Sequence, residues 1–171
     1  MRVKCAWGKF RELSPILTVR GLSLKMKGKI YEACVQSVLV YGSETWALKV
    51  CDKQQLERTE RMMVRWMCGV TLKNKLRSQD LLERLDIVGV AERVSRGRLR
   101  WFGHVERKSD DDWVSKCRHI VIGGGRSRGR NRKTWMVCVQ TDMTKLGLSR
   151  VDAQDRVSWR KSIFGNRPTC A

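Results

Sequence analysis

Apolar residues recur at intervals of three and four along most of the chain, which predicts a succession of short amphipathic helices. The stripe that begins after Ser23 consists of Ile30, Cys34, Val38 and Tyr41, with Tyr31 and Val35 beside it. The β-branched run 38–40 is compatible with a strand, but the spacing favours a helix that ends at Gly42.

The next two helices are predicted from their caps as well as from their stripes. Asp52 is expected to cap a helix that ends at Gly69. Its apolar side is formed by Leu56, Thr59, Met63, Trp66 and Met67. Its opposite side carries Arg58, Arg61 and Arg65. A basic loop with Lys73, Lys75 and Arg77 follows, and Ser78 is expected to cap a short leucine-rich helix.

Further helices are predicted on both sides of this central part. Ser14-Pro15 indicates a helix start, because proline is favoured in the first turn. Another helix is marked by Val90, Val94, Trp101 and Val105. Thr134 is expected to cap a helix ending near Gly147, and the segment 149–152 is expected to cap the last helix, with Ala153, Val157 and Trp159. No strand–turn–strand pattern is found, so we expect an all-α fold, a small irregular helical domain.

The pattern divides the 171 residues into four segments, in a chain long enough for one domain or two very small ones. We expect a helical region at 1–70 and a basic helical connection at 71–122. Residues 123–133 form a basic Gly/Arg-rich linker, and 134–171 form the C-terminal helices with a frayed tail.

The charge of the chain indicates a class of partner. The sequence contains 36 Lys and Arg residues but only 17 Asp and Glu residues, which gives a net charge of +19. A polyanion is the expected partner, and the phosphate backbone of RNA or DNA fits best. A membrane fits less well, since no long apolar run is present. The predicted contacts combine cations near aromatic residues with the cations of the linker. They are Arg61, Arg65, Arg98, Arg100, His104, Arg107, Arg126, Arg128, Arg130, Arg132 and Lys133.

Catalytic and metal sites have little support in the sequence. The seven cysteines are scattered without a Cys-x-x-Cys pair, so neither a disulfide scaffold nor a zinc site is expected, and reduced thiols suggest an intracellular protein. Asp110, Asp111 and Asp112 form the one acidic cluster, and they suit a helix start better than a metal site. We expect no cofactor and no catalytic residue.

Several motifs together resemble the C-terminal region of the reverse transcriptases of non-LTR (LINE-type) retrotransposons. They lie at Leu39–Trp46, Arg61–Gly69, Arg98–Val105 and Asp155–Arg160. A further segment, Gly129–Trp135, is similar to the family's Gly-Arg-Pro-Arg-Lys-Thr-Trp, with Asn131 in the place of proline. The resemblance covers essentially the whole chain.

The resemblance implies the thumb and post-thumb helices of such an enzyme. The family's polymerase motif, an aromatic residue followed by x-Asp-Asp, is not present, and neither is its endonuclease, so no catalytic residue carries over and no polymerase activity is expected. The implied role is to grip template–primer or element RNA, with the reverse transcriptase palm as a possible packing partner. The alternatives are a host-retained protein-interaction module and a non-functional relic reading frame.

Overall fold

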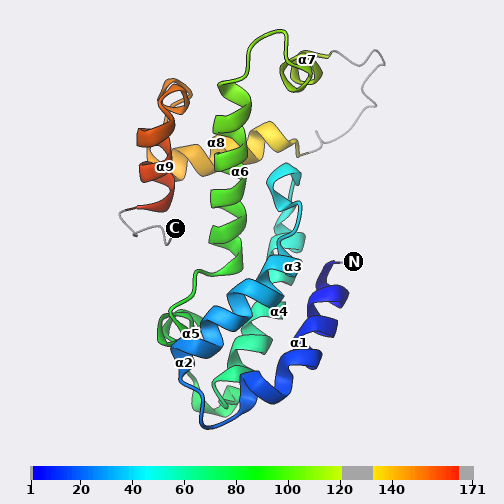
Figure 1. The fold of residues 1–171 in the computed structure, drawn as a ribbon, viewed down its shortest axis with the longest axis vertical. Helices are drawn as coiled ribbons and strands as arrows, with labels where there is room; N and C mark the ends of the chain where they lie inside the picture. The colour runs from blue at the N-terminus through cyan, green and yellow to red at the C-terminus, as the bar shows by residue number, and fades with distance from the viewer. Residues whose placement is uncertain (1, 121–132, 166–171) are drawn as a thin grey trace. The chain divides into compact units, whose positions relative to one another are not determined.

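The computed structural model of the protein describes residues 2–120 and 133–165, and every regular element within them is helical, which confirms the all-α fold (Figure 1). The elements of the first part of the chain are α1 (Arg2–Thr18), α2 (Leu24–Ile30), the π-helix η1 (Tyr31–Gln36), α3 (Ser37–Leu39), η2 (Ser43–Thr45) and α4 (Val50–Met67). The second part contains η3 (Leu72–Asn74), α5 (Ser78–Leu85), α6 (Val90–Glu106), α7 (Trp113–His119), α8 (Trp135–Leu146), η4 (Val151–Gln154) and α9 (Arg156–Phe164).

The helices group into two compact units. Unit 1 comprises Met1–Ser43 and Lys49–Val94, and unit 2 comprises Glu44–Leu48 and Ser95–Ala171. The division therefore falls within α6, and a five-residue segment between α3 and α4 belongs to unit 2. The four sequence-based segments differ from these units in their bounds and stay a prediction.

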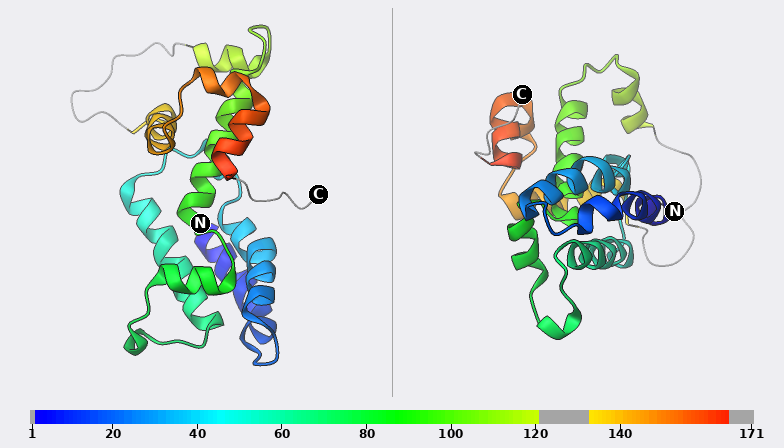
Figure 2. Two further views of the ribbon diagram at one scale, coloured as in Figure 1. Left: turned by 90° about the vertical axis from the view of Figure 1, so that its left-hand side faces the viewer. Right: turned by 60° about the horizontal axis from the view of Figure 1, so that its bottom comes forward.

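Unit 1 is built on α1, which packs against η1, α3 and α4, while α2 packs against α5 (Figure 2). Its fully buried side chains include Phe10, Leu17, Met63 and Leu81. Gly28 allows the backbone of α2 to lie close to the end of α5, because a Cβ at this position would lie 1.9 Å from the carbonyl oxygen of Leu85.

The predicted helix start at Pro15 is wrong, because Pro15 lies inside α1. Proline cannot donate the backbone hydrogen bond that Arg11 O would otherwise accept. The hydroxyl of Ser14 donates to Arg11 O instead, at 2.8 Å. A side-chain hydrogen bond thus replaces the missing backbone one and lets the helix continue to Thr18.

The apolar stripe predicted after Ser23 is displaced by one position. The residues fully buried there are Tyr31, Val35 and Leu39, whereas Tyr41 is 65% exposed. A π-helix with i→i+5 hydrogen bonds occupies residues 31–36 of this stretch in place of the expected α-helix. Ser23 itself caps α2, and its side chain accepts from Met26 N.

The predicted helix ends are more accurate than the predicted starts. Gly69 follows α4 with a φ of 65° and Gly147 follows α8 with a φ of 64°, which confirms both glycine stops. Thr134 caps α8 as predicted. Asp52, however, lies within α4 and accepts from the backbone of Lys49, the actual N-cap residue. The last predicted helix is divided into η4 and α9, and Asp155 caps α9.

A buried polar network holds the π-helix to α4 in unit 1. Glu60 is only 5% exposed and accepts from Gln36 Nε2 at 2.9 Å and from Val90 N at 2.7 Å. Arg93 completes the network by donating to Gln36 and Glu32. Burial raises the pKa of the Glu60 carboxyl above its usual value, against the opposing effect of its hydrogen bonds.

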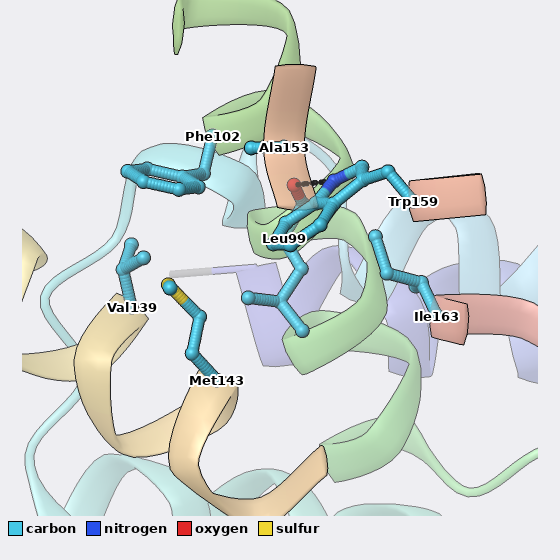
Figure 3. Close-up of a cluster of buried hydrophobic side chains, with 7 residues drawn as sticks. All are labelled: Leu99, Phe102, Val139, Met143, Ala153, Trp159 and Ile163. Atoms are coloured by element: carbon cyan, nitrogen blue, oxygen red, sulfur yellow. Dashed lines mark hydrogen bonds between the residues drawn. The ribbon is translucent and has the colours of Figure 1, made fainter. Parts of the chain in front are cut away.

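Unit 2 has its own apolar core, shown in Figure 3. Its members come from α6, α8, η4 and α9, and they are Leu99, Phe102, Val139, Met143, Ala153, Trp159 and Ile163. Trp159 also donates its indole N–H to Leu99 O at 3.0 Å. No helix within the described residues has the length and apolar character needed to cross a lipid bilayer.

Candidate nucleic-acid interface

The cation-rich segment 98–107 comprises the C-terminal half of α6 and Arg107, the residue that follows the helix, and the helix separates the side chains of the segment onto two sides. Leu99, Phe102 and Val105 face the core of unit 2. Gly103 lies so close to Trp159 that a Cβ there would be 2.4 Å from the indole nitrogen. This glycine is therefore required by the packing of α9 against α6.

Arg98 was predicted to be a nucleic-acid contact, and its position in the structure contradicts that prediction. Its side chain is buried, with 5% of the residue exposed, and it forms an ion pair with the equally buried Asp142 of α8. A guanidinium group paired inside unit 2 is not available to a phosphate on the surface. Arg98 thus connects α6 to α8 and is removed from the candidate interface.

Arg107 is also committed to the fold. Its guanidinium donates to the carbonyl oxygen of Ala153 in η4. The contact helps to hold η4 against the end of α6, and the side chain remains only partly exposed. Arg107 contributes positive charge near the surface, but its hydrogen-bonding geometry is set by the protein.

The outer side of the segment retains the groups that a nucleic acid could reach. Arg100 and His104 are exposed one helical turn apart. Trp101, one of the residues that marked this helix in the sequence, is only half-buried, and its ring stacks on His104 with centroids 5.3 Å apart. The buried aromatic residue is its neighbour Phe102.

Motifs that are far apart in the sequence meet within unit 2. Trp135 donates its indole N–H to Glu44 O at 2.7 Å, and Cys138 contacts Leu48 O. Trp159 makes the equivalent bond to Leu99 O. The four residues joined by these two tryptophan hydrogen bonds lie in four of the motifs noted in the sequence, so these motifs supply part of the core of unit 2 and the contacts that connect its segments.

In unit 1, the two predicted cations of α4 have different environments. Arg61 is exposed. Arg65 donates from Nη1 to Thr71 O at 3.0 Å and from Nη2 to Leu76 O at 2.9 Å. Its two bonds hold both ends of the loop between α4 and α5. The side chain of Arg61 is available to a ligand, whereas the guanidinium of Arg65 is used to hold the loop.

The loop that Arg65 holds carries surface groups that the sequence-based set of site residues omitted. Lys73, Lys75 and Arg77 are exposed, and Arg77 is paired with Asp80. Leu72 is 77% exposed. The run of basic residues indicated a charged loop, but no sequence signal showed that the loop is held in one conformation.

The acidic cluster has structural partners. Asp112 caps α7 and pairs with Lys108, and these hydrogen bonds lower the pKa of its carboxyl. Asp111 forms an ion pair with Lys116, with 3.6 Å between Oδ1 and Nζ. Within residues 2–120 and 133–165, no group of three or more His, Cys, Asp or Glu side chains is arranged to hold a metal ion.

The surface that remains is strongly cationic. Among the described residues, exposed Lys and Arg side chains outnumber exposed Asp and Glu by more than two to one. Of the predicted contacts, Arg61, Arg100, His104 and Lys133 are exposed. Arg126, Arg128, Arg130 and Arg132 lie outside the described residues, as do most of the predicted linker and the end of the tail.

The chain is similar to a protein of Caenorhabditis elegans that is described as transposon-derived and uncharacterized. The two are 25% identical over 118 residues, which is 67% of this chain and 42% of the relative. The chain thus matches less than half of the length of that protein. No protein-family model matches the chain, and no solved structure matches it significantly. The similarity indicates a transposon-related origin.

Proposed function

We propose that the chain is the thumb and post-thumb region of a non-LTR retrotransposon reverse transcriptase, and that it binds nucleic acid through phosphate contacts without catalysis of its own. The transposon-derived relative supports the origin, and the sequence motifs supply the narrower family. In an intact enzyme, such helices would hold template–primer or element RNA beside the polymerase palm.

The excess of exposed cations carries the binding proposal. After the cations used inside the fold are set aside, among them Arg98 and Arg65, the exposed charged side chains of the described residues are still mostly Lys and Arg. Such an excess repels itself in the absence of a polyanion. Phosphate groups neutralise it and release counterions, which makes the binding favourable and dependent on salt.

The exposed groups of α4 and α6 are proposed as contacts, together with the Gly/Arg segment that precedes the N-cap of α8. They are Arg61, Arg100, His104, Arg126, Arg128, Arg130, Arg132 and Lys133. These contacts would position the backbone and would not read the sequence, because phosphates carry no base identity. We therefore expect similar affinity for duplexes of unrelated sequence.

The test is fluorescence anisotropy with labelled duplex DNA, RNA and an RNA–DNA hybrid over a series of salt concentrations. We expect log K to fall linearly with log salt. The triple variant Arg61→Gln, Arg100→Gln and Lys133→Gln should reduce the slope by up to about 2.7, at about 0.9 for each phosphate. A second variant, with Gln at Arg126, Arg128, Arg130, Arg132 and Lys133, should reduce it by several units as well.

A matched control removes positive charge from cations that already have carboxylate partners. Lys9 pairs with Glu12 at 2.9 Å, and Lys53 pairs with Glu57 at 3.7 Å. Changing both to Gln should alter the slope much less per charge removed. Absence of binding at low salt, or binding that does not depend on salt, would contradict the proposal and favour a protein-interaction role.

A further inference from the structure

We propose that the loop 71–77 of unit 1 is a wedge for double-stranded nucleic acid, in which Leu72 enters the minor groove while Lys73 and Lys75 contact phosphates beside it. The inference rests on the proposed function, since it assumes that the ligand is a nucleic acid. It goes further by naming the form of the ligand, the groove and the side chain that enters it.

The loop is held at both ends by one side chain. The guanidinium of Arg65 on α4 donates to Thr71 O at 3.0 Å and to Leu76 O at 2.9 Å. The planar fork of arginine can bridge two carbonyl oxygens in a fixed geometry, which lysine cannot do. The ends of the loop are thereby fixed relative to α4, and only the residues between them project.

The tip of the loop is also fixed from within. Asn74 Oδ1 accepts from Thr71 N at 2.8 Å and from Thr71 Oγ1 at 3.0 Å. Lys75 has a φ of 50°, a left-handed conformation that is unusual for a residue with a side chain, and its N–H donates to Leu72 O. These bonds define a single turn around η3, so the exposed side chains are presented in a set arrangement.

The side chains presented in this way suit a duplex. Leu72 is 77% exposed, and Lys73 and Lys75 have no ion-pair partner among the residues that the structure describes. Ammonium groups fit phosphates, but a leucine gains nothing from them and needs an apolar surface. A minor groove provides both, because phosphates border it and apolar side chains can insert between its base steps and unstack them.

The test uses the full chain and a DNA duplex with 2-aminopurine at one step, whose fluorescence rises when the base unstacks. Wild type should raise the fluorescence on binding. Leu72→Ser should abolish the rise and weaken binding about tenfold, with an unchanged salt slope. The matched control is Leu146→Ser, at a leucine of α8 that is 47% exposed, and it should change neither measurement.

Two further variants separate charge from geometry. Lys73→Gln with Lys75→Asn removes two cations, and Asn tolerates the left-handed backbone at position 75, so the salt slope should fall by up to about 1.8. The control, Lys25→Gln with Lys29→Gln on α2, should leave the fluorescence rise intact. Asn74→Ala alters no charge, yet it should reduce the rise, because the tip loses its internal hydrogen bonds.

The outcomes distinguish this inference from the proposed function. Salt-dependent binding in which Leu72→Ser keeps the full fluorescence rise would overturn the wedge and leave the general phosphate contacts standing. Loss of binding to anionic lipid vesicles or to a protein partner in Leu72→Ser, with duplex binding unaffected, would assign the loop to that other ligand. Absence of any nucleic-acid binding by wild type would remove the proposed function and this inference together.

Discussion

Gly103 offers the sharpest test of the packing in unit 2. An alanine Cβ at this position would lie 2.4 Å from Nε1 and 2.6 Å from Cδ1 of Trp159, far inside normal contact distance. Trp159 is 2% exposed and donates to Leu99 O, so it cannot move away without leaving its place in the core. The substitution Gly103→Ala should therefore destabilise unit 2.

The magnitude follows from three contributions. Overpacking a filled core costs about 1–3 kcal/mol. Loss of the bond between the indole and Leu99 O adds about 1 kcal/mol. Alanine is the better helix former by about 1 kcal/mol, which opposes both. The net effect is a loss of roughly 2 kcal/mol in the free energy of unfolding of unit 2.

The control lies in the same helix. A Cβ at Gly97 has no atom within 4 Å, so Gly97→Ala should gain about 1 kcal/mol from helix propensity alone. Urea titration followed by circular dichroism compares the two variants, and hydrogen exchange of residues 156–164 locates the change in α9. If Gly103→Ala is as stable as Gly97→Ala, then α9 does not pack against α6 as described.

Three more predictions concern groups that are used inside the fold. Asp142→Asn should destabilise unit 2 by about 3–5 kcal/mol in urea titration because it leaves the Arg98 charge buried, whereas Arg98→Met with Asp142→Leu should be close to neutral and leave the salt dependence of nucleic-acid binding unchanged. The raised pKa of Glu60 means that the folded state holds its proton more tightly than the unfolded state, so stability should fall as the pH rises above the ordinary glutamate pKa of 4.5 and through the raised pKa of the folded state. Glu60→Gln should flatten that slope, and a slope that is unchanged would show that another group causes it. Ser14→Ala should lose about 1 kcal/mol in urea titration, but almost nothing in a Pro15→Ala background, where the backbone can donate to Arg11 O.

The sequence predicted those parts of the fold that depend on neighbouring residues. Gly69 and Gly147 end helices because a left-handed residue is needed there, and glycine adopts that conformation without strain. Thr134 caps α8 through a hydrogen bond to a residue three positions away. The prediction for Pro15 is wrong because it used only the preference of proline for the first turn of a helix. The hydroxyl of Ser14 allows proline inside α1, since it supplies the hydrogen bond to Arg11 O that proline cannot donate.

The sequence could not predict the roles that depend on distant partners. Arginine is a residue type that commonly contacts phosphates, so the sequence placed Arg98 in the interface. Only its ion pair with Asp142, 44 residues later in the chain, shows that Arg98 lies in the interior. In the same way, the 3.6-residue repeat predicted neither the π-helix η1 nor the one-position shift of the buried stripe. Of the candidate interface, the sequence predicted the net charge and the exposed Arg61 and Arg100, but it did not separate these from the cations that serve the fold.

The membership of residues 44–48 in unit 2 has a consequence for the order in which the chain can fold as it is synthesised. All of unit 1 has been made once Val94 has been added, but the partners of Glu44 and Leu48 are Trp135 and Cys138, about ninety residues further on. Unit 1 can therefore fold early in synthesis, whereas residues 44–48 can form their contacts only after α8 has been made. The units are also interleaved along the chain, so no single cut separates them: a fragment starting at Ser95 would lack the acceptor of Trp135.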